Sequence, residues 1–127
     1  MKILIVEDDA VTARIYGQWL LKAGYEVKTA KTGPEALAQV GLWEPDGVLL
    51  DLMLPNLNGL EVLTRIRSEA SALPVIMCTN AFSAAVRDQG LAAGATRVLD
   101  KSLLKSLDLA AEFDSAFKAT GQKRRAA

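Results

Sequence analysis

Five short apolar runs recur along the chain, and each is followed by a polar segment or a turn residue. Runs of about four apolar residues between turn signals predict the buried strands of a parallel sheet. The predicted strands cover residues 3–6, 25–29, 47–50, 75–78 and 97–99. Segments with helical periodicity separate them, and strands that alternate with helices are typical of βαβ units. The pattern therefore predicts an α/β fold around one parallel sheet.

The first three predicted helices have recognisable ends and apolar faces. The apolar positions of the first are Val11, Ile15, Trp19 and Leu20. Gly24 would end that helix, and Pro34 suits the first position of the second helix, which runs towards Leu42. The third helix follows Gly59, with Leu60, Leu63 and Ile66 on its apolar side and Glu61, Arg65 and Glu69 outside.

The last two helices differ in their expected stability. Residues 83–93 are mostly alanine with one glycine inside and another just beyond, so the fourth helix is predicted to be weak. The fifth helix is predicted from about Ser102 to Thr120, with an apolar stripe of Leu103, Leu107, Ala110, Phe113 and Phe117. We expect one compact domain over residues 1–120. Residues 121–127 are interpreted as a flexible basic tail, which could instead bind an anionic partner or begin a linker.

Composition and charge narrow the possible functions. Half of the 127 residues are apolar, and 15 basic residues balance 15 acidic ones, which gives no electrostatic argument for nucleic-acid or membrane binding. No stretch approaches the ~18 apolar residues of a membrane span, and the first apolar run is too short for a signal sequence. The single cysteine, Cys78, lies inside an apolar run as a core residue. It excludes a disulfide framework and favours a reducing compartment, so we expect a cytoplasmic protein.

Polar residues stand within two positions of the ends of four of the predicted strands. They are Glu7, Asp8, Asp51, Thr79 and Lys101. The carboxyl ends of parallel strands meet at one edge of a sheet, where α/β proteins place their ligands. We therefore expect three acids, a hydroxyl and an ammonium to converge on one crevice.

Such a crevice has the chemistry of a phosphate-handling site. Neighbouring carboxylates repel one another unless a cation lies between them, and oxygen ligands with room for water suit Mg²⁺. We therefore predict a magnesium site at Glu7, Asp8 and Asp51. Lys101 and Thr79 would hold the oxygens of a phosphoryl group. Asp51 is the candidate nucleophile, because a carboxylate can accept a phosphoryl group to form an acyl phosphate.

At these residues the chain resembles the receiver domain of bacterial two-component response regulators, over residues 1–119 or so. The matching segments are Ile3-Leu4-Ile5-Val6-Glu7-Asp8-Asp9, Asp51-Leu52-Met53-Leu54-Pro55 with Gly59, Pro74-Val75-Ile76-Met77 leading to Thr79, Gly94-Ala95, and Lys101. The resemblance implies a doubly wound, flavodoxin-like fold with five parallel strands in the order 2-1-3-4-5 and five helices.

The resemblance also implies a role for each site residue. Asp51 would receive a phosphoryl group from the phosphohistidine of a sensor histidine kinase, assisted by Thr79 and Lys101. The Mg²⁺ ligands would be Asp51, Asp8, Glu7 through a water molecule, and the backbone carbonyl of Met53. Asp9 comes directly after this acid pair and is interpreted as a helix cap.

Three positions depart from the family pattern. Val98 stands three residues before the site lysine, where the family usually has a Tyr or Phe ring that turns inward. We therefore expect activation to shift the loop after Thr79 and the fourth helix more than the fifth strand. Ser102 replaces the proline common after the lysine, which predicts a trans peptide bond and a residue that could cap the fifth helix. Asn80 replaces a very small residue, and could add a hydrogen bond or obstruct closure of the loop.

We interpret the chain as a phosphorylation-controlled switch, a monomer or weak dimer that acts by binding an unknown output protein. It would not be an enzyme, beyond accepting a phosphoryl group from a donor and losing it slowly. Slow loss is expected because Met53 and Ala81, which flank the path of the attacking water in receivers, cannot hydrogen-bond that water.

Two other interpretations of the sequence stay open. A receiver-like interaction module that is never phosphorylated is disfavoured by the complete set of site residues. A phosphatase with an aspartate nucleophile would need an acid at the position of Met53. Dinucleotide binding is disfavoured because no G-x-G-x-x-G segment comes after the first strand.

Overall fold

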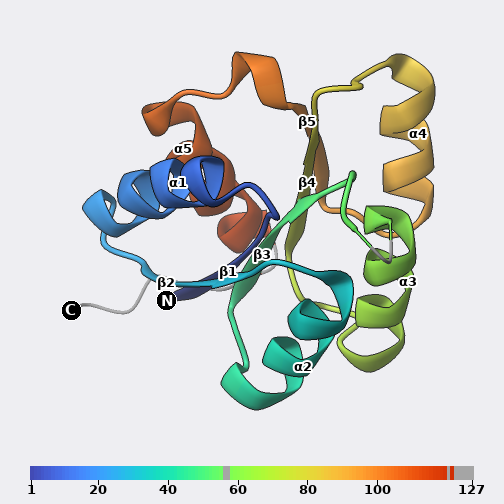
Figure 1. Ribbon diagram of the computed structural model, residues 1–127, viewed down its shortest axis with the longest axis horizontal. Helices are drawn as coiled ribbons and strands as arrows, with labels where there is room; N and C mark the ends of the chain where they lie inside the picture. Colours follow the sequence, from blue (N-terminus) through green and yellow to red (C-terminus); the bar gives the residue numbers. More distant parts are fainter. Residues whose placement is uncertain (56–57, 120, 122–127) are drawn as a thin grey trace.

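The computed structural model of the chain describes residues 1–55, 58–119 and 121, and for Leu107 the backbone alone. Its centre is a parallel sheet of five strands (Figure 1). The strands are β1 (Lys2–Val6), β2 (Glu26–Ala30), β3 (Gly47–Asp51), β4 (Val75–Thr79) and β5 (Arg97–Asp100). Their order is β2-β1-β3-β4-β5, as the resemblance implied. Each predicted strand is present, and no end differs from the prediction by more than one residue.

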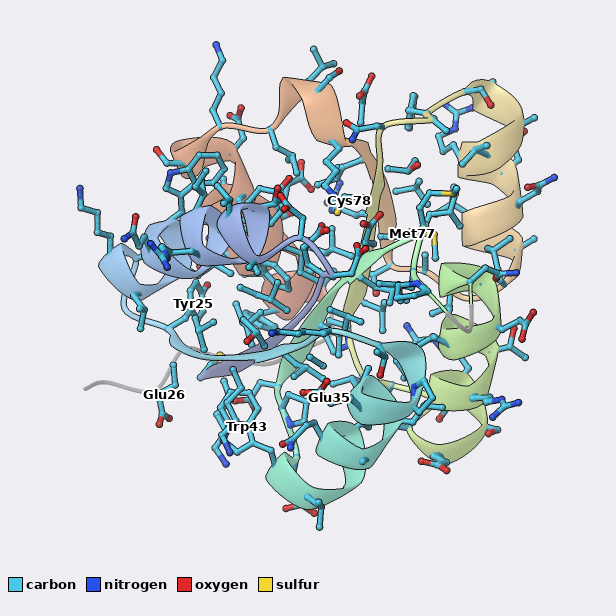
Figure 2. The ribbon with its side chains drawn as sticks, viewed as in Figure 1. Tyr25, Glu26, Glu35, Trp43, Met77 and Cys78 are labelled. Carbon is cyan, nitrogen blue, oxygen red and sulfur yellow. The ribbon has the colours of Figure 1, made fainter. Side chains whose placement is uncertain are left out.

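Helices cover both faces of the sheet. They are α1 (Ala10–Lys22), α2 (Gly33–Trp43), α3 (Gly59–Glu69), α4 (Ala84–Ala92) and α5 (Ser106–Ala119). Figure 1 shows α1 and α5 on one face, and α2, α3 and α4 on the other. Met77 and Cys78, neighbours in β4, accordingly point into different apolar clusters (Figure 2). No helix within the described ranges is long and apolar enough to cross a membrane.

The helices that come after β1, β2, β3 and β4 begin at polar side chains. The caps are Asp9, Thr32, Asn58 and Ser83. Each accepts a hydrogen bond from the backbone N–H three residues further on, which satisfies one of the free donors of the first turn. The interpretation of Asp9 as a cap is confirmed. These caps fix where each helix leaves the carboxyl edge of the sheet, and so fix the loops around that edge.

The predicted apolar face of the first helix is wrong in part. Val11 is 66% exposed and Ile15 is also exposed, whereas the buried residues are Ala13, Tyr16, Gly17 and Leu20. The helix is rotated relative to the prediction because small residues and one aromatic ring bring it close to the sheet. The helical spacing of aliphatic residues alone therefore predicted the wrong side of this helix as the buried one.

The predicted start of the last helix is also wrong. Lys101–Leu103 form a short 3₁₀ helix, and α5 begins only at Ser106. Ser102 does not cap α5, because both its backbone N–H and its hydroxyl donate to Asp100 Oδ1, at 3.0 Å and 2.7 Å. Leu103, expected in the core, is 70% exposed. The bond before Ser102 is trans, as are the other described peptide bonds.

Two further expectations concern the end of the chain and the packing of α4. The predicted helix end at Thr120 and all but the first residue of the basic tail lie outside the described residues, as does the side chain of Leu107. The prediction that α4 is weakly held agrees with its packing, because its only buried residue is Gly90.

Gly59 is required by a close approach of two backbone segments. A Cβ atom at this position would lie 2.5 Å from the carbonyl oxygen of Asp51 and 2.7 Å from Leu52 Cα. The Gly59 N–H also donates to the carbonyl of Leu52 at 2.7 Å. Neither contact atom is at the end of a flexible side chain, so only glycine lets α3 start this close to the end of β3.

We predict that Gly59→Ala lowers the free energy of unfolding by about 2 kcal/mol, because the new methyl group overpacks against backbone. Urea unfolding followed by circular dichroism measures this change. The matched control is Gly41→Ala in α2, where a Cβ would meet nothing within 4 Å. That variant should gain about 0.5–1 kcal/mol from helix propensity. Equal effects of the two substitutions would contradict the steric assignment.

Candidate functional site

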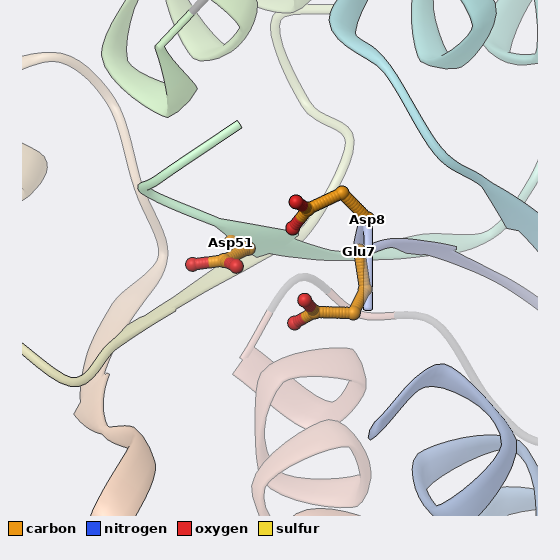
Figure 3. A group of neighbouring side chains, drawn as sticks. All are labelled: Glu7, Asp8 and Asp51. Carbon is orange, nitrogen blue, oxygen red and sulfur yellow. The ribbon is translucent and has the colours of Figure 1, made fainter. Parts of the chain in front are cut away.

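The acidic residues of the predicted site meet at the carboxyl edge of the sheet. Glu7 and Asp8 come directly after β1, and Asp51 ends the adjacent strand β3. Figure 3 shows the three carboxylates together, and one oxygen from each lies within 4.8 Å of the others. Glu7 is 3% exposed and Asp51 5%, whereas Asp8 is exposed. The arrangement combines two buried carboxylates with one that faces solvent.

Lys101 reaches this group from the end of β5, at the edge of the sheet. Its Nζ lies 2.5 Å from Glu7 Oε2 and 3.2 Å from Asp51 Oδ2, and both contacts are hydrogen-bonded ion pairs. The lysine side chain is itself largely buried. One ammonium therefore partly neutralises two buried carboxylates, which would otherwise repel each other.

Burial and these contacts shift the pKa values of Glu7 and Lys101. Burial raises the pKa of Glu7 above its usual value, although the hydrogen bond from Lys101 acts in the opposite direction. Burial alone would lower the pKa of Lys101. The hydrogen bond to Glu7 and the charge of Asp51 outweigh it and raise that pKa well above the usual value. The ammonium therefore stays charged at neutral pH and remains a fixed positive charge beside Asp51.

Backbone amides complete the surroundings of Asp51 and Thr79. The N–H of Met53 donates to Asp51 Oδ1 at 3.1 Å, while the Met53 side chain is 67% exposed. Thr79 is fully buried and lies one residue beyond the β4 partner of Asp51. Its Oγ1 accepts a hydrogen bond from the N–H of Ala81 at 3.0 Å. The expected ligand role of the Met53 carbonyl stays a prediction.

Sequence reasoning did not identify three residues that contact or lie near the charged groups of the site. The N–H of Asp9 donates to Glu7 Oε1 at 3.1 Å and so orients that carboxylate. Tyr16 and Cys78 are buried near the charged groups, and burial raises the pKa of each to about 12. The helical spacing of Ala13, Tyr16 and Leu20 is the one sequence signal that could have identified Tyr16 as an inward-facing residue.

The sequence matches the response regulator receiver domain family over residues 3–112. The response regulator MprA of Mycobacterium avium is 40% identical over 101 residues, which is 80% of this chain and 44% of that protein. The corresponding protein of Mycobacterium leprae is 41% identical over the same length. The chain thus spans less than half the length of these curated relatives. The chain belongs to the response regulator receiver domain family.

Solved structures agree with this assignment. A CheY-like receiver domain protein from Methanospirillum hungatei has a TM-score of 0.88 at 29% identity, and the match covers 94% of this chain and 95% of that one. The chemotaxis response regulator CheY4 of Vibrio cholerae has a TM-score of 0.84 at 31% identity, covering 91% and 97%. Receiver domains are parts of two-component systems and are regulatory rather than enzymatic.

The donor set suits the metal that receiver domains typically bind, Mg²⁺. Carboxylate oxygens are the ligands that this cation prefers, and it usually keeps several waters. Glu7, Asp8 and Asp51 offer three such oxygens in one group. Asp8 is on the solvent side, where a hydrated ion would enter.

We predict that Lys101→Met lowers the free energy of unfolding by about 3 kcal/mol in EDTA, because it leaves two buried carboxylates without their cation. Added Mg²⁺ should stabilise this variant more than it stabilises the unmodified protein, since the metal then supplies the only positive charge. Urea unfolding at several Mg²⁺ concentrations measures both effects.

The control for this experiment is Lys105→Met, which removes an exposed lysine from the segment before α5. It should leave both the unfolding free energy and its Mg²⁺ dependence near those of the unmodified protein. The charge assignment would be wrong if Lys101→Met unfolded like Lys105→Met, or if Mg²⁺ stabilised the two variants equally.

Proposed function

We propose that the chain is a signalling switch that accepts a phosphoryl group on Asp51 from the phosphohistidine of a sensor histidine kinase. The observation that carries the proposal is the pairing of a buried carboxylate with a fixed ammonium beside an acidic pair: Asp51, Lys101, and Glu7 with Asp8. A purely structural salt bridge would not need the exposed third acid, Asp8.

The proposed transfer uses each residue in one role. An oxygen of Asp51 forms a bond to phosphorus as the P–N bond of the donor breaks, and the electron pair of that bond stays with the leaving imidazole. Lys101 balances the negative charge on the phosphoryl oxygens, and the hydroxyl of Thr79 donates to one of them. When bound, Mg²⁺ supplies further charge neutralisation at Glu7, Asp8, Asp51 and the carbonyl of Met53.

The proposal also covers the output partner of the chain and its location in the cell. Output occurs by binding another protein, whose identity the chain does not define, and the receiver unit occupies residues 1–120. We place the exchange in the cytoplasm, where ATP-dependent kinases form phosphohistidine and where a free thiol such as Cys78 stays reduced. The exposed Met53, at the position where aspartate-nucleophile phosphatases carry an acid, argues against turnover of external phosphate esters.

We predict that acetyl phosphate and Mg²⁺ suffice to phosphorylate the purified chain, because the donor needs only the pre-organised charges around Asp51. Intact-mass spectrometry should show one added phosphoryl group. Asp51→Asn should abolish this addition, whereas the exposed carboxylate control Asp88→Asn should be labelled like the unmodified protein. Equal labelling of Asp51→Asn would show that another residue is the nucleophile.

We also predict that the acyl phosphate is lost slowly, because the side chains of Met53 and Ala81 cannot orient an attacking water. Met53→Asn combined with Ala81→Glu should accelerate dephosphorylation by about tenfold, equivalent to ~1.4 kcal/mol of barrier. Decay of the phosphorylated mass measures the rate. An apolar control, Met53→Leu with Ala81→Val, should leave it unchanged. Rapid loss from the unmodified protein, or no acceleration in the polar variant, would contradict the assignment.

A further inference from the structure

The turn directly after β5 determines where the side chain of Lys101 points. Side chains along a strand alternate between the two faces of the sheet, and Val98 and Leu99 accordingly pack against different apolar clusters. If the strand continued in extended form, Lys101 would point like Leu99 towards α1 and α5. Its ammonium instead lies 3.2 Å from Asp51 Oδ2, at the end of a strand two places away in the sheet. The chain therefore changes direction between Asp100 and Lys101.

Apolar packing does not hold this turn. Residues Lys101–Leu103 form the 3₁₀ helix, and none of the three is buried. Leu103 is 70% exposed, and Leu104, the residue after the helix, packs only partly against an apolar cluster. The backbone hydrogen bond that closes the turn, from the Leu104 N–H to the Lys101 carbonyl, is long at 3.4 Å. The conformation of the turn must therefore be fixed at its start.

Asp100 supplies the hydrogen bonds that fix the start of the turn. Its Oδ1 accepts from the Ser102 N–H at 3.0 Å and from the Ser102 hydroxyl at 2.7 Å. The backbone of Asp100 is extended, with φ −79° and ψ 114°, as is usual for a residue that caps a helix. A proline at position 102 would offer neither donor. We call Asp100 and Ser102, the two neighbours of Lys101 that these bonds join, the lysine clamp.

A lysine needs such a clamp because its side chain is flexible. The ammonium is a compact charge on a four-carbon stem, and ordering that stem costs conformational entropy. Asp100 pairs with Thr79 at the end of β4, so Lys101 begins one residue further on and has to reach past β4 to Asp51. A fixed backbone direction at Lys101 leaves only the outer part of the side chain to be ordered by its ion pairs.

We propose that Asp100 is a positioning residue for the candidate phosphorylation site, because its hydrogen bonds to Ser102 direct the Lys101 ammonium towards Asp51. This inference rests on the proposed function, in which Lys101 balances charge on the phosphoryl oxygens. The role requires an oxygen acceptor at position 100 and not a negative charge. Asparagine should therefore substitute for Asp100, whereas alanine should not.

Acetylation of lysine by an N-hydroxysuccinimide ester tests the clamp without any phosphoryl chemistry. The side chain of Lys101 is 11% exposed, so it should react slowly in the unmodified protein. Asp100→Ala should raise the acetylation rate of Lys101 by about tenfold, because the cap of the turn is lost. Asp100→Asn should leave the rate unchanged, since its amide oxygen can accept the same two bonds. Peptide mass spectrometry measures both rates.

The control is Thr32→Ala, which removes a helix cap of the same kind beside β2, at the opposite edge of the sheet from β5. It should leave the acetylation rate of Lys101 unchanged. An unchanged rate in Asp100→Ala, or equal rates in Asp100→Ala and Asp100→Asn, would overturn the clamp. If Asp100→Ala does not fold, Ser102→Ala decides, because losing the hydroxyl donor alone should raise the rate by about threefold. No increase in that variant would overturn the clamp.

Binding of beryllofluoride, a phosphoryl mimic, tests the positioning of Lys101 at the site. Fluorine NMR in the presence of Mg²⁺ measures its affinity. Asp100→Ala should weaken binding by about tenfold, because the ammonium is no longer held where the phosphoryl oxygens bind. Asp100→Asn should bind like the unmodified protein. Unchanged affinity in Asp100→Ala would overturn the positioning role.

A double-mutant cycle separates this role from a general effect on the fold. In Lys101→Met, adding Asp100→Ala should cause no further loss of affinity, because the side chain that Asp100 positions is absent. A further loss as large as that in the unmodified background would show that Asp100 acts independently of Lys101, and would overturn the proposal. If the unmodified protein does not bind the mimic, the proposed function fails, whereas the acetylation of Lys101 still decides the clamp.

Discussion

The contact of Lys101 with Glu7 and Asp51 is the interaction on which the rest of the site depends. The strand order places β4 between β3 and β5, and both β3 and β4 between β1 and β5. At a spacing of about 4.8 Å between strands, the lysine must span roughly 10 Å to reach the end of β3. It does so because the chain turns into a 3₁₀ helix immediately after β5 and directs Lys101 inward. Sheet topology and loop geometry together bring this charge to the carboxylates.

This concentration of charge is costly for the fold. Glu7 and Asp51 are almost fully buried, and two carboxylates so close to each other destabilise the protein unless cations compensate. The compensation in this structure comes from one ammonium and two backbone N–H groups. The favourable free energy of folding therefore comes from the two apolar clusters on either side of the sheet. The carboxyl edge can then hold charged side chains that do not stabilise the fold.

The sequence predicted the parts of the fold that depend on local pattern. Continuous apolar runs identified the five strands, and polar residues within two positions of their ends identified Glu7, Asp8, Asp51, Thr79 and Lys101. The face of α1 was not predicted, because packing through Tyr16 and Gly17 leaves Val11 in solvent, and periodicity alone does not report which side meets the sheet. The hydrogen bonds of the Arg67 guanidinium were also not predictable, since its carbonyl partners at Gly94, Ala70 and Leu73 come together only in the tertiary structure.

Cys78 is kept chemically inert by its place on a buried strand behind the site. The thiol lies in the apolar cluster behind Asp51, and its pKa of about 12 keeps it protonated at any physiological pH. Oxidants and alkylating agents react with exposed thiolates, and this residue offers neither exposure nor charge. The crevice thus presents hard oxygen and nitrogen groups to solvent, whereas the thiol of Cys78 is buried in the apolar cluster that α1 and α5 cover. Oxidants in solution therefore have no direct route to the one thiol of the chain.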